Sequence, residues 1–499
     1  MISKEIIDKY KVTIGIECHV QLKTKTKLFS GSLNDSTTTQ VNHLTNHIDF
    51  GLPGALPVTN KEAIELAIMA GYALNTRAQK FSKFDRKHYF YPDLPMGYQI
   101  TQYEFPILTG GFVDIISDNN EIKRIEITRA HLEADAGKSI HPLGSDYSLV
   151  DLNRSGAPLL EIVSEPQMHT PLEAKNYCFE LYLAMKLAQV SDVNLFYGNM
   201  RFDVNVSVSK TDELGTRTET KNLNSFRSVE KSIEFETLRQ IDVLENGGEI
   251  RQETRGWNDA KQSGFTQRVK ENADDYRYMP DPDVPPILIE DELLDQIKSS
   301  MPILPIEWRQ KLTKLNLDVE QVNLLLGAHA DYLSQPLDLL NKVIDDESRA
   351  KTYANWLINI ELPLLQKSEE QDNAKGLLVI DSTKREAIFN QVYQLKVDNK
   401  LNSTKLNLLI EALLKLPETV DDIEKWAQTE GFLQNSDESF LKDIVSNVIA
   451  SNPKVVQDIK DGQTKAAGFL VGQIMKETKG QANPQIINRL IAEQIKADN

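Results

Sequence analysis

Cysteine is almost absent from this sequence of 499 residues, and its scarcity excludes two kinds of site. The two cysteines, Cys18 and Cys178, are far apart and belong to no Cys-x-x-Cys pair. Disulfide frameworks and thiolate zinc sites need closely patterned cysteines, so neither is expected. We expect both thiols to be buried and unreactive, as free cysteines usually are.

Long apolar runs are missing as well. No stretch approaches the roughly 18–20 consecutive apolar residues that a membrane-spanning helix requires. The first residues, MISKEIIDKYK, have neither an apolar leader segment nor the arginine- and serine-rich character of a transit peptide. Hydrophobic residues make up 40% and charged residues 26% of the chain, as in ordinary globular proteins. We therefore expect a cytoplasmic protein without membrane contact.

The sequence also lacks the common phosphate-binding and nucleophile motifs. Residues 137–139, Gly-Lys-Ser, fit the end of a phosphate-binding loop, but Leu132 occupies the position of its first glycine. No GxGxxG segment opens a helix, and no GxSxG motif is present. If the chain uses ATP, a metal ion and basic side chains must hold the phosphates.

Positive charge is in short supply, since the formal net charge is −17. A surface that attracted nucleic acid everywhere would carry the opposite sign, so any RNA contact must be local, and no DNA partner is expected. Residues 411–440 contain eight acidic and two basic residues, whereas residues 441–499 contain eight basic and six acidic residues. This change marks a domain boundary near residue 440 or somewhat earlier.

The spacing of apolar residues divides the chain into a mixed half and a helical half. Strict alternation over 12–22 and 201–208 predicts two half-buried strands, and helical spacing predicts helices over 61–75 and 228–245. Beyond residue 292 nearly every apolar residue has helical spacing. Because 499 residues exceed what one core usually organises, several domains are expected. The predicted fold class is α+β, with a β-rich N-terminal domain and a helical remainder.

The end of the chain carries a further helix signal. Asn483 and Pro484 suit an N-cap followed by proline at the first helical position. The apolar stripe of this last predicted helix consists of Ile486, Ile487, Leu490, Ile491 and Ile495.

Glu17 and His19 lie on the polar face of the first predicted strand. Residues two apart on a strand project to the same side about 7 Å apart, so these two could share one metal ion or substrate. The alternative is the solvent-exposed polar side of an amphipathic strand.

A second polar set lies in ITRAHLEADAGKS, where four polar residues alternate with apolar or small ones: Arg129, His131, Glu133 and Asp135. An extended backbone would place them on one face. Two carboxylates so close together favour a divalent cation such as Mg²⁺, which prefers oxygen ligands. An exposed strand edge is the alternative.

Glu161 is the one acid in the run Pro-Leu-Leu-Glu-Ile-Val, which otherwise predicts a fully buried strand. An unpaired buried carboxylate is costly, so Glu161 needs a cation, a metal ion or a strong donor as its partner. A structural ion pair with Arg154 or Arg129 is the alternative to a functional role.

The segment FDRKHYFYPDLPMGYQ, predicted as a loop, combines Arg86 and Lys87 with several aromatic residues. Such a mixture suits a phosphate-bearing or stacked ligand. The alternative is a small satellite core.

Taken together, these segments resemble the B-subunit family of glutamyl/aspartyl-tRNA amidotransferases. The resemblance rests on IGIECHVQL, FDRKHYFYPDLPMGYQI, ITRAHLEADAGKS, LVDLNRSGAPLLEIVSEP, ETKNLNSF, QETR, DDYRYMPDPD and AAGFLVGQIMKETKGQANPQ. They occur in family order over nearly the whole chain, which chance would not produce.

The resemblance implies a cradle domain over 1–292, a helical linker domain over 293–405 and a YqeY-like, tRNA-binding helical tail over 406–499. The cradle would bind ATP and Mg²⁺, phosphorylate the side-chain carboxylate of misacylated Glu-tRNA(Gln) or Asp-tRNA(Asn), and amidate it with ammonia. The glutaminase of the complex, its A subunit, would supply the ammonia, while a small C subunit would fasten the other two together. The chain would thus be part of a heterotrimeric ATP-dependent carbon–nitrogen ligase with glutamine as amido donor.

Matching motif positions assign metal-ligand roles to four residues: Glu17, His19, Glu133 and Glu161. Many relatives carry two adjacent glutamates after the residues that match His131 and Leu132, whereas this chain has Glu133 followed by Ala134. Asp135 is therefore a second candidate for the acid at this position.

The resemblance also implies roles for basic residues. Lys87 matches a lysine along the route by which ammonia arrives, whereas Met96 stands where some relatives have a second lysine. Candidates for phosphate or carboxylate contacts are Arg129, Lys138, Asn153 and Arg154. Among all these, the residues expected to take part in catalysis are Glu17, His19, Lys87, Arg129 and Arg154.

Two other functions stay open at this point. The chain could be a non-catalytic tRNA-binding or assembly adaptor, or a free-standing metal hydrolase built on the predicted metal ligands. The hydrolase is disfavoured because no dedicated nucleophile is recognisable.

Overall fold

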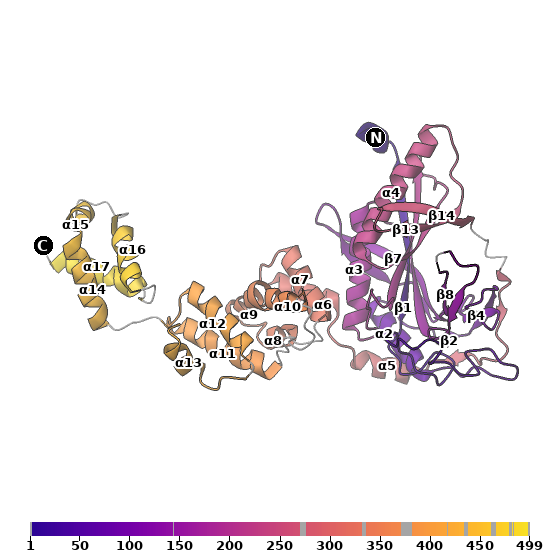
Figure 1. Cartoon of the computed structure of the whole chain (residues 1–499), viewed down its shortest axis with the longest axis horizontal. Coiled ribbons are helices and arrows are strands. Elements are labelled where there is room, and N and C mark those ends of the chain that lie inside the picture. The colour runs from indigo at the N-terminus through magenta and orange to yellow at the C-terminus, as the bar shows by residue number, and fades with distance from the viewer. Residues whose placement is uncertain are drawn as a thin grey trace. The chain divides into compact units, whose positions relative to one another are not determined.

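The computed structural model divides the chain into two compact units, residues 1–309 and 310–499. It describes residues 2–142, 144–269, 276–331, 336–370, 382–416, 418–433, 438–460, 466–478, 482 and 484–497. The first unit contains all the described strands, and the described elements of the second are helical (Figure 1). The predicted α+β class with a β-rich N-terminal part is confirmed. Within the described residues, no helix has the length and apolar character needed to cross a membrane.

A nine-stranded sheet forms the centre of the first unit. Its path is β14-β13-β12-β11-β1-β10-β7-β5, and β6 also pairs with β7. The strands are β1 (Lys11–Gln21), β5 (Leu108–Thr109), β6 (Phe112–Ile116), β7 (Ile122–Ala134), β10 (Pro158–Ser164), β11 (Met200–Ser209), β12 (Thr218–Leu223), β13 (Glu253–Asn258) and β14 (Ser263–Val269). Neighbouring strands are antiparallel except β12 and β13, which are parallel.

The two alternating segments of the sequence are the central strands β1 and β11, as predicted. Their apolar side chains are buried except Val12, which is half-buried, and α3 (Pro171–Leu187) and α4 (Phe226–Glu245) pack along the sheet (Figure 1). Both cysteines are free and buried in this layer, which confirms their predicted burial. Fully burying one large aliphatic side chain contributes about 1.5–3 kcal/mol to the stability of the fold. Packing against these helices therefore fixes the apolar face of the sheet, and the polar face remains available for other contacts.

Both helices predicted in the first half are present as α2 (Lys61–Ala73) and α4. The side chain of Ser225 caps α4 by accepting a hydrogen bond from the Ser228 backbone N–H. The helix ends before Gly247, whose φ of 74° is readily adopted by glycine because it has no Cβ atom. A short helix, α1 (Lys4–Ile7), precedes β1.

A small sheet faces the polar side of the central strands. It consists of β15 (Met279–Pro280), β3 (Asp85–His88) and β4 (Tyr98–Thr101), so the segment predicted as a loop contains two paired strands. The Gln99 side chain donates to the carbonyl of Ala134 at 2.9 Å, which ties β4 to β7. The remaining strand pairs are β2 (Phe81–Ser82) with β16 (Ile287–Leu288) and β8 (Lys138–Ile140) with β9 (Leu149–Asp151).

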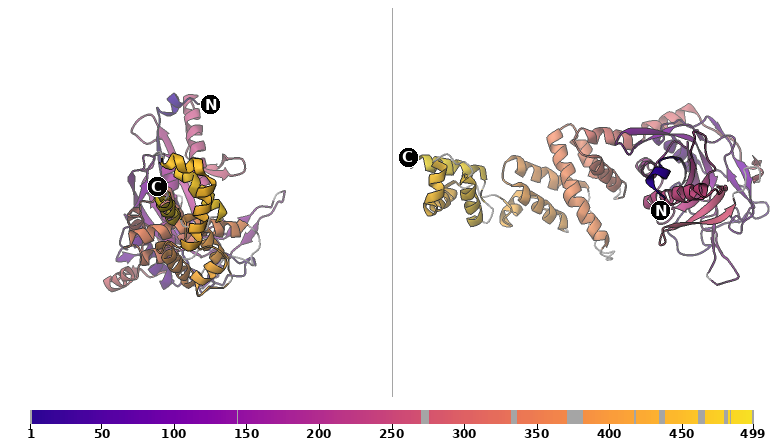
Figure 2. Two further views of the ribbon diagram at one scale, coloured as in Figure 1. Left: turned by 90° about the vertical axis from the view of Figure 1, so that its left-hand side faces the viewer. Right: turned by 90° about the horizontal axis from the view of Figure 1, so that it is seen from above.

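The described elements of the second unit are helices, which Figure 2 shows from two further sides. Its first part has an aromatic core that contains Tyr353, Trp356 and Phe389. After α5 (Asp291–Ser299) and α6 (Pro305–Thr313), the helices are α7 (Val319–Asp331), α8 (Pro336–Lys342), α9 (Glu347–Trp356), the π-helix η2 (Leu357–Glu361), α10 (Leu362–Glu370), α11 (Ser382–Val397), α12 (Ser403–Lys415) and α13 (Ile423–Thr429).

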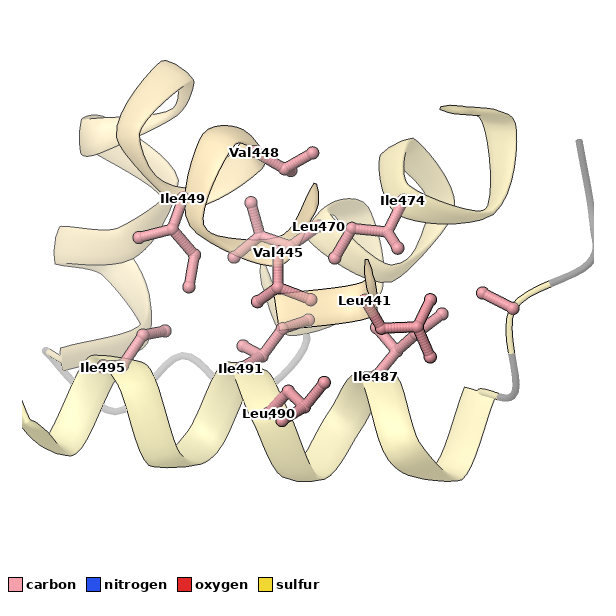
Figure 3. Close-up of a cluster of buried hydrophobic side chains, with 11 residues drawn as sticks. Leu441, Val445, Val448, Ile449, Leu470, Ile474, Ile487, Leu490, Ile491 and Ile495 are labelled. Carbon is pink, nitrogen blue, oxygen red and sulfur yellow. The ribbon is translucent and has the colours of Figure 1, made fainter. Parts of the chain in front are cut away.

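The last four helices have a hydrophobic core of their own, drawn in Figure 3. They are α14 (Glu438–Ser451), α15 (Pro453–Lys460), α16 (Ala467–Glu477) and α17 (Pro484–Ala497). Leu441 and Val445 on α14 lie against Ile487 and Ile491 on α17 (Figure 3). The predicted last helix is thus confirmed with Pro484 as its first residue, while its predicted N-cap, Asn483, lies outside the described residues.

The predicted domain limits at 292/293 and 405/406 both lie within helices. Helix α5 packs on α2 of the first unit, where the Tyr72 hydroxyl donates to the carbonyl of Leu294 at 2.9 Å. Helix α12 packs on α11 and η2. The three domain ranges stay predictions, and the observed compact units divide after Arg309.

Candidate metal centre

The register of three strands brings acidic and imidazole side chains into one row. His19 on β1 is opposite Glu161 on β10, and Glu161 is opposite His131 on β7. On the other side of β1, His19 is opposite Arg201 on β11. Directly opposed residues of antiparallel strands project to the same face, so all four side chains share the polar side of the sheet.

The first acid cluster consists of His19, Glu133 and Glu161. Nε2 of His19 lies 3.4 Å from Glu161 Oε2 and 3.9 Å from Glu133 Oε1. Ligand atoms of the three residues all lie within 4.8 Å of one another. Nε2 of His131 approaches the same two carboxylates at 3.5 and 3.8 Å. This spacing allows the three groups to close around one cation.

The ionisation of the first cluster is set by its own members. Burial lowers the pKa of His19, but the hydrogen bond and the charge of Glu161 outweigh this and raise it to about 9. Burial raises the pKa of Glu161, yet His131, His19 and Lys87 hold it well below its usual range. Within the described structure, Nδ1 of buried His131 has no hydrogen-bond partner. The positively charged groups around Glu161 therefore keep it ionised as a carboxylate.

Glu17 belongs to a second acid cluster with Asp203 and Glu219, so the four predicted metal ligands are divided between two groups. Glu17 is opposite Asp203 in the β1–β11 ladder, and Glu219 is opposite Asn205 in the next ladder. The physical reason for the division is the strand spacing, because Glu17 projects one side-chain repeat away from His19.

A single lysine balances part of the second cluster. Nζ of Lys221 lies 2.7 Å from Asp203 and 3.2 Å from Glu219. Burial and the charges of Glu161 and Glu219 raise the pKa of Glu17. Burial also raises the pKa of Asp203, but the charges of Lys221 and His19 bring it below its usual value. Three carboxylates facing one lysine leave negative charge that a second cation would neutralise.

The sequence analysis missed two members of the second cluster, Asp203 and Glu219, and also the lysine that contacts them, Lys221. The alternation of β11 places Asp203 on the polar face of its strand but does not show which residues lie beside it. For Glu219 and Lys221, the available signal was their spacing of two residues, which places both side chains on one face of a strand. Their role depends on strands that the sequence does not pair.

Lys87 on β3 faces the first cluster across the two sheets. Its ammonium lies 4.8 Å from the ring centroid of Tyr276 and 5.9 Å from that of Tyr89. Burial lowers the pKa of Lys87, but Glu133, Tyr278 and Glu161 raise it overall. Tyr278 stacks on Tyr103 with centroids 4.0 Å apart. The aromatic residues thus form a wall around a protonated lysine.

Asp135 has surroundings different from those of Glu133, although the sequence left both as candidates. Its Oδ2 lies 3.1 Å from Arg201 and 3.2 Å from Arg154. Glu133 instead lies in the first cluster and accepts a hydrogen bond from Thr101 at 3.4 Å. The geometry therefore favours Glu133 as the acid that faces a cation.

Two arginines lie away from Glu161. Arg154 donates to the carbonyls of Ala136 and Gly137, and Arg129 donates to the carbonyl of Tyr103 at 3.4 Å. In the described structure Glu161 pairs with the two histidines instead of with either arginine.

The three predicted cofactor-binding residues, Lys138, Asn153 and Arg154, line one cavity of about 270 Å³ together with Gln21 and Tyr197. Asn153 uses both ends of its side chain to hold the neighbouring loop, accepting from the backbone of Leu44 and donating to that of Gln40. Gln21 follows His19 on the same face of β1, so this cavity begins where the first cluster ends. Met96 lines a separate cavity of about 30 Å³ with Ile48 and Leu94.

Comparisons with known proteins show the family of this chain. Residues 12–295 match the GatB/GatE catalytic domain family, and residues 338–495 match the GatB domain family, whose YqeY portion confirms the predicted type of tail. The chain is 40% identical over 494 residues to the B subunit of aspartyl/glutamyl-tRNA(Asn/Gln) amidotransferase from Carboxydothermus hydrogenoformans, covering 98% of this chain and 99% of the relative. It is 41% identical over 495 residues to the same-named protein of Caldicellulosiruptor bescii, with 98% and 99% covered. The chain therefore belongs to the GatB family, the B subunits of aspartyl/glutamyl-tRNA(Asn/Gln) amidotransferases.

Proposed function

We propose that this protein uses ATP and Mg²⁺ to phosphorylate the side-chain carboxylate of a misacylated tRNA and then amidates that carboxylate with ammonia. The substrates would be Glu-tRNA(Gln), Asp-tRNA(Asn) or both. The observation that carries the proposal is the pair of adjoining acid clusters on the polar face of the sheet.

The donor sets of both clusters fit divalent cations. Glu133 and Glu161 offer carboxylate oxygens beside His19, and the second cluster offers three carboxylates. Hard oxygen ligands of this kind suit Mg²⁺. Bound there, Mg²⁺ would neutralise phosphate charge and let two anionic reactants approach each other. The buried side chains of the two clusters are held in fixed positions for this purpose. The reaction requires no protein nucleophile.

Lys87 would hold a positive charge beside the reacting carboxylate, because Glu133 and Glu161 keep it protonated. The tyrosines around it would limit access of water, which matters because ammonia in bulk water is largely protonated and then no longer nucleophilic. Met96 has an uncharged side chain, so it would provide no second charge on this route.

Basic residues near the clusters would contact phosphate groups. Lys138 and Arg154 line one cavity, and Asn153 would hold the loop that forms part of its wall. Arg129 lies on the same face of β7 as His131. An arginine or lysine contributes here by positioning and electrostatic attraction.

The ammonia is proposed to come from the A subunit of the complex, a glutaminase, with a C subunit joining the two, because no glutaminase motif is recognisable in this chain. The helical tail is proposed to bind tRNA, and the complex would work in the cytoplasm. The relatives are named as B subunits, which supports the existence of partner subunits.

The test is phosphate release and amide formation by the reconstituted complex with misacylated tRNA. Glu161→Gln and Glu17→Gln should each lower both rates by about 100-fold or more, the order lost when a charge-stabilising group is removed. Glu165→Gln is the matched control, since Glu165 follows the same strand, accepts a hydrogen bond from Thr128 and belongs to neither acid cluster.

Unimpaired rates in both cluster variants would refute the roles of these residues. A non-catalytic adaptor would instead bind misacylated tRNA without any ATP hydrolysis in the complete complex.

A further inference from the structure

An exposed aromatic pair lies on the turn between α3 and β11, at the rim of the cavity that contains Lys138 and Arg154. Phe196 is 86% exposed, more than any other large apolar side chain of the described residues, and Tyr197 is 48% exposed. Their rings meet edge to face with centroids 5.2 Å apart. Because Tyr197 also lines the cavity, the pair and the cavity form one surface.

Buried polar side chains hold the turn in place. Ser191 donates to the carbonyl of Gln21, at the end of β1. Asn199 donates to the Gln21 side chain at 3.1 Å, and its backbone N–H donates to the carbonyl of Asn194 at 2.9 Å. The Asn194 side chain in turn accepts from the backbone N–H of Tyr197 at 3.0 Å. Since the turn is already ordered, binding a ligand to its two rings would cost little conformational entropy.

The charged side chains of the cavity differ in how far they are already occupied. Arg154 donates to two backbone carbonyls. The two acids that line the cavity, Asp35 and Asp151, each accept hydrogen bonds from neighbouring backbone N–H groups. Lys138 is exposed, and within the described residues no side-chain hydrogen bond or ion pair occupies its ammonium. Lys138 is therefore available to pair with a phosphate group.

Exposed rings beside a free cation suit single-stranded nucleic acid, whose bases stack on aromatic side chains while cations contact its backbone. Paired RNA bases do not offer their faces, so the matching part of a tRNA is its unpaired 3′ end. Gln21 lies two residues beyond His19 on β1, so this cavity begins about 7 Å from the first acid cluster. A terminal nucleotide whose amino acid reaches that cluster would place the preceding nucleotides near the aromatic pair.

We propose that Phe196 and Tyr197 form a stacking platform for the unpaired bases that precede the terminal adenosine of the tRNA, with Lys138 contacting their phosphates. The inference rests on the proposed function and adds two positioning residues that lie outside the sheet and outside both acid clusters. Docking of a partner protein on the same pair is the competing interpretation, and the experiment separates the two.

The experiment titrates the full-length chain with RNA minihelices that end in CCA or lack these three nucleotides. Wild type should bind the CCA-ended minihelix more tightly by about fivefold or more, the lower end of what stacking of one base contributes. Phe196→Ala should remove most of this preference. Phe196→Trp should keep it because an aromatic face remains, whereas Phe196→Leu should lose it although the side chain stays apolar. Substitution of so exposed a side chain should not impair folding.

Phe265→Ala is the matched control. Phe265 is also an exposed aromatic residue, but it lies on the edge strand β14 and does not line this cavity. This variant should keep the wild-type preference for the CCA-ended minihelix.

Equal binding of both minihelices by wild type would overturn the proposal, and so would a Phe196→Leu variant that keeps the full preference. Weaker assembly of Phe196→Ala with the A subunit at unchanged RNA affinity would assign the pair to protein docking and also overturn it. None of these results affects the proposed function. That function fails instead if the complete wild-type complex releases no phosphate from ATP in the presence of misacylated tRNA.

Discussion

Glu133 and Asp135 are two residues apart, yet the fold gives their carboxylates different tasks. Glu133 faces His19 and Glu161 across the first acid cluster. Asp135 lies just beyond the end of β7 and is held by two arginines, Arg154 and Arg201. A carboxylate already paired with two guanidinium groups has little to offer a metal ion. At the scale of residues, the distinction between ligand and ion-pair partner therefore comes from the neighbours and not from the residue type.

This difference predicts separate effects of neutralising each acid. Glu133→Gln should weaken binding of Mg²⁺, or of Mn²⁺ as its spectroscopic substitute, by about tenfold or more, since loss of a neighbouring group alone typically costs 10- to 100-fold. Asp135→Asn should leave metal affinity within a few-fold of wild type and lower the unfolding temperature, because it leaves two arginines without their partner. Metal titration and thermal unfolding of both variants provide the check, and an equal loss of metal affinity would contradict it.

The π-helix η2 is the element whose geometry has the clearest consequence. A π-turn widens a helix locally and re-aims its side chains. Here it ends at Glu361, which is fully buried and lies 3.0 Å from Nε of Arg385 on α11. Arg385 is itself only 4% exposed. The ion pair thus joins η2 to α11 inside the helical unit.

Removing one partner of this pair should destabilise the helices around it by about 3–5 kcal/mol, because a charge remains buried without compensation. Arg385→Met is the test, read as faster hydrogen exchange in α9 to α11 of the full-length chain. The double variant Arg385→Met with Glu361→Leu should recover much of the loss, since no unpaired charge remains. Lys415→Ala, which removes an exposed pair with Glu411, should change stability by no more than about 0.5 kcal/mol. A single variant as stable as this control would show that the pair contributes nothing.

Strand β10 shows how far an element can be predicted from its own residues. The sequence predicted a fully buried strand with one acid that needs a cation, a metal ion or a strong donor as its partner. The strand is present and mostly buried, and Glu161 has a partner in His19. The predicted alternatives for that partner were Arg154 and Arg129, whereas the structure provides His19 and His131. Alternation is a local property of the chain, but register between strands about 140 residues apart is not.

For the molecule as a whole, the proposed tRNA binding by the helical tail would be compatible with the negative net charge of the chain. The tail has its own hydrophobic core, and its helices carry exposed lysines that include Lys442, Lys454 and Lys476. A local set of lysines can attract phosphate within a Debye length, even on a chain with a net charge of −17.

Truncation after residue 433 should therefore weaken tRNA affinity while the first unit keeps its fold and its ATP binding. The cut leaves α13, which packs on α11, in place.

Changing Lys442, Lys454 and Lys476 to glutamine should lower the slope of log affinity against log salt by about 0.7–0.9 per lost phosphate contact. Neutralising the exposed acids Asp443 and Glu477 on the same helices should strengthen binding. Filter binding at several salt concentrations measures these effects, and equal tRNA affinity of the truncated and complete chains would contradict the role of the tail.

The sequence alone determined which residues share a strand face, where the helical half begins and to which family the chain belongs, because these follow from local periodicity and from motif order. Only the tertiary structure decided that Glu17 joins Asp203 and Glu219, and that Arg201 and Arg154 hold Asp135. These outcomes depend on which strands pair and in which register. That choice is made by the packing of the entire sheet against its helices, so no single segment encodes it.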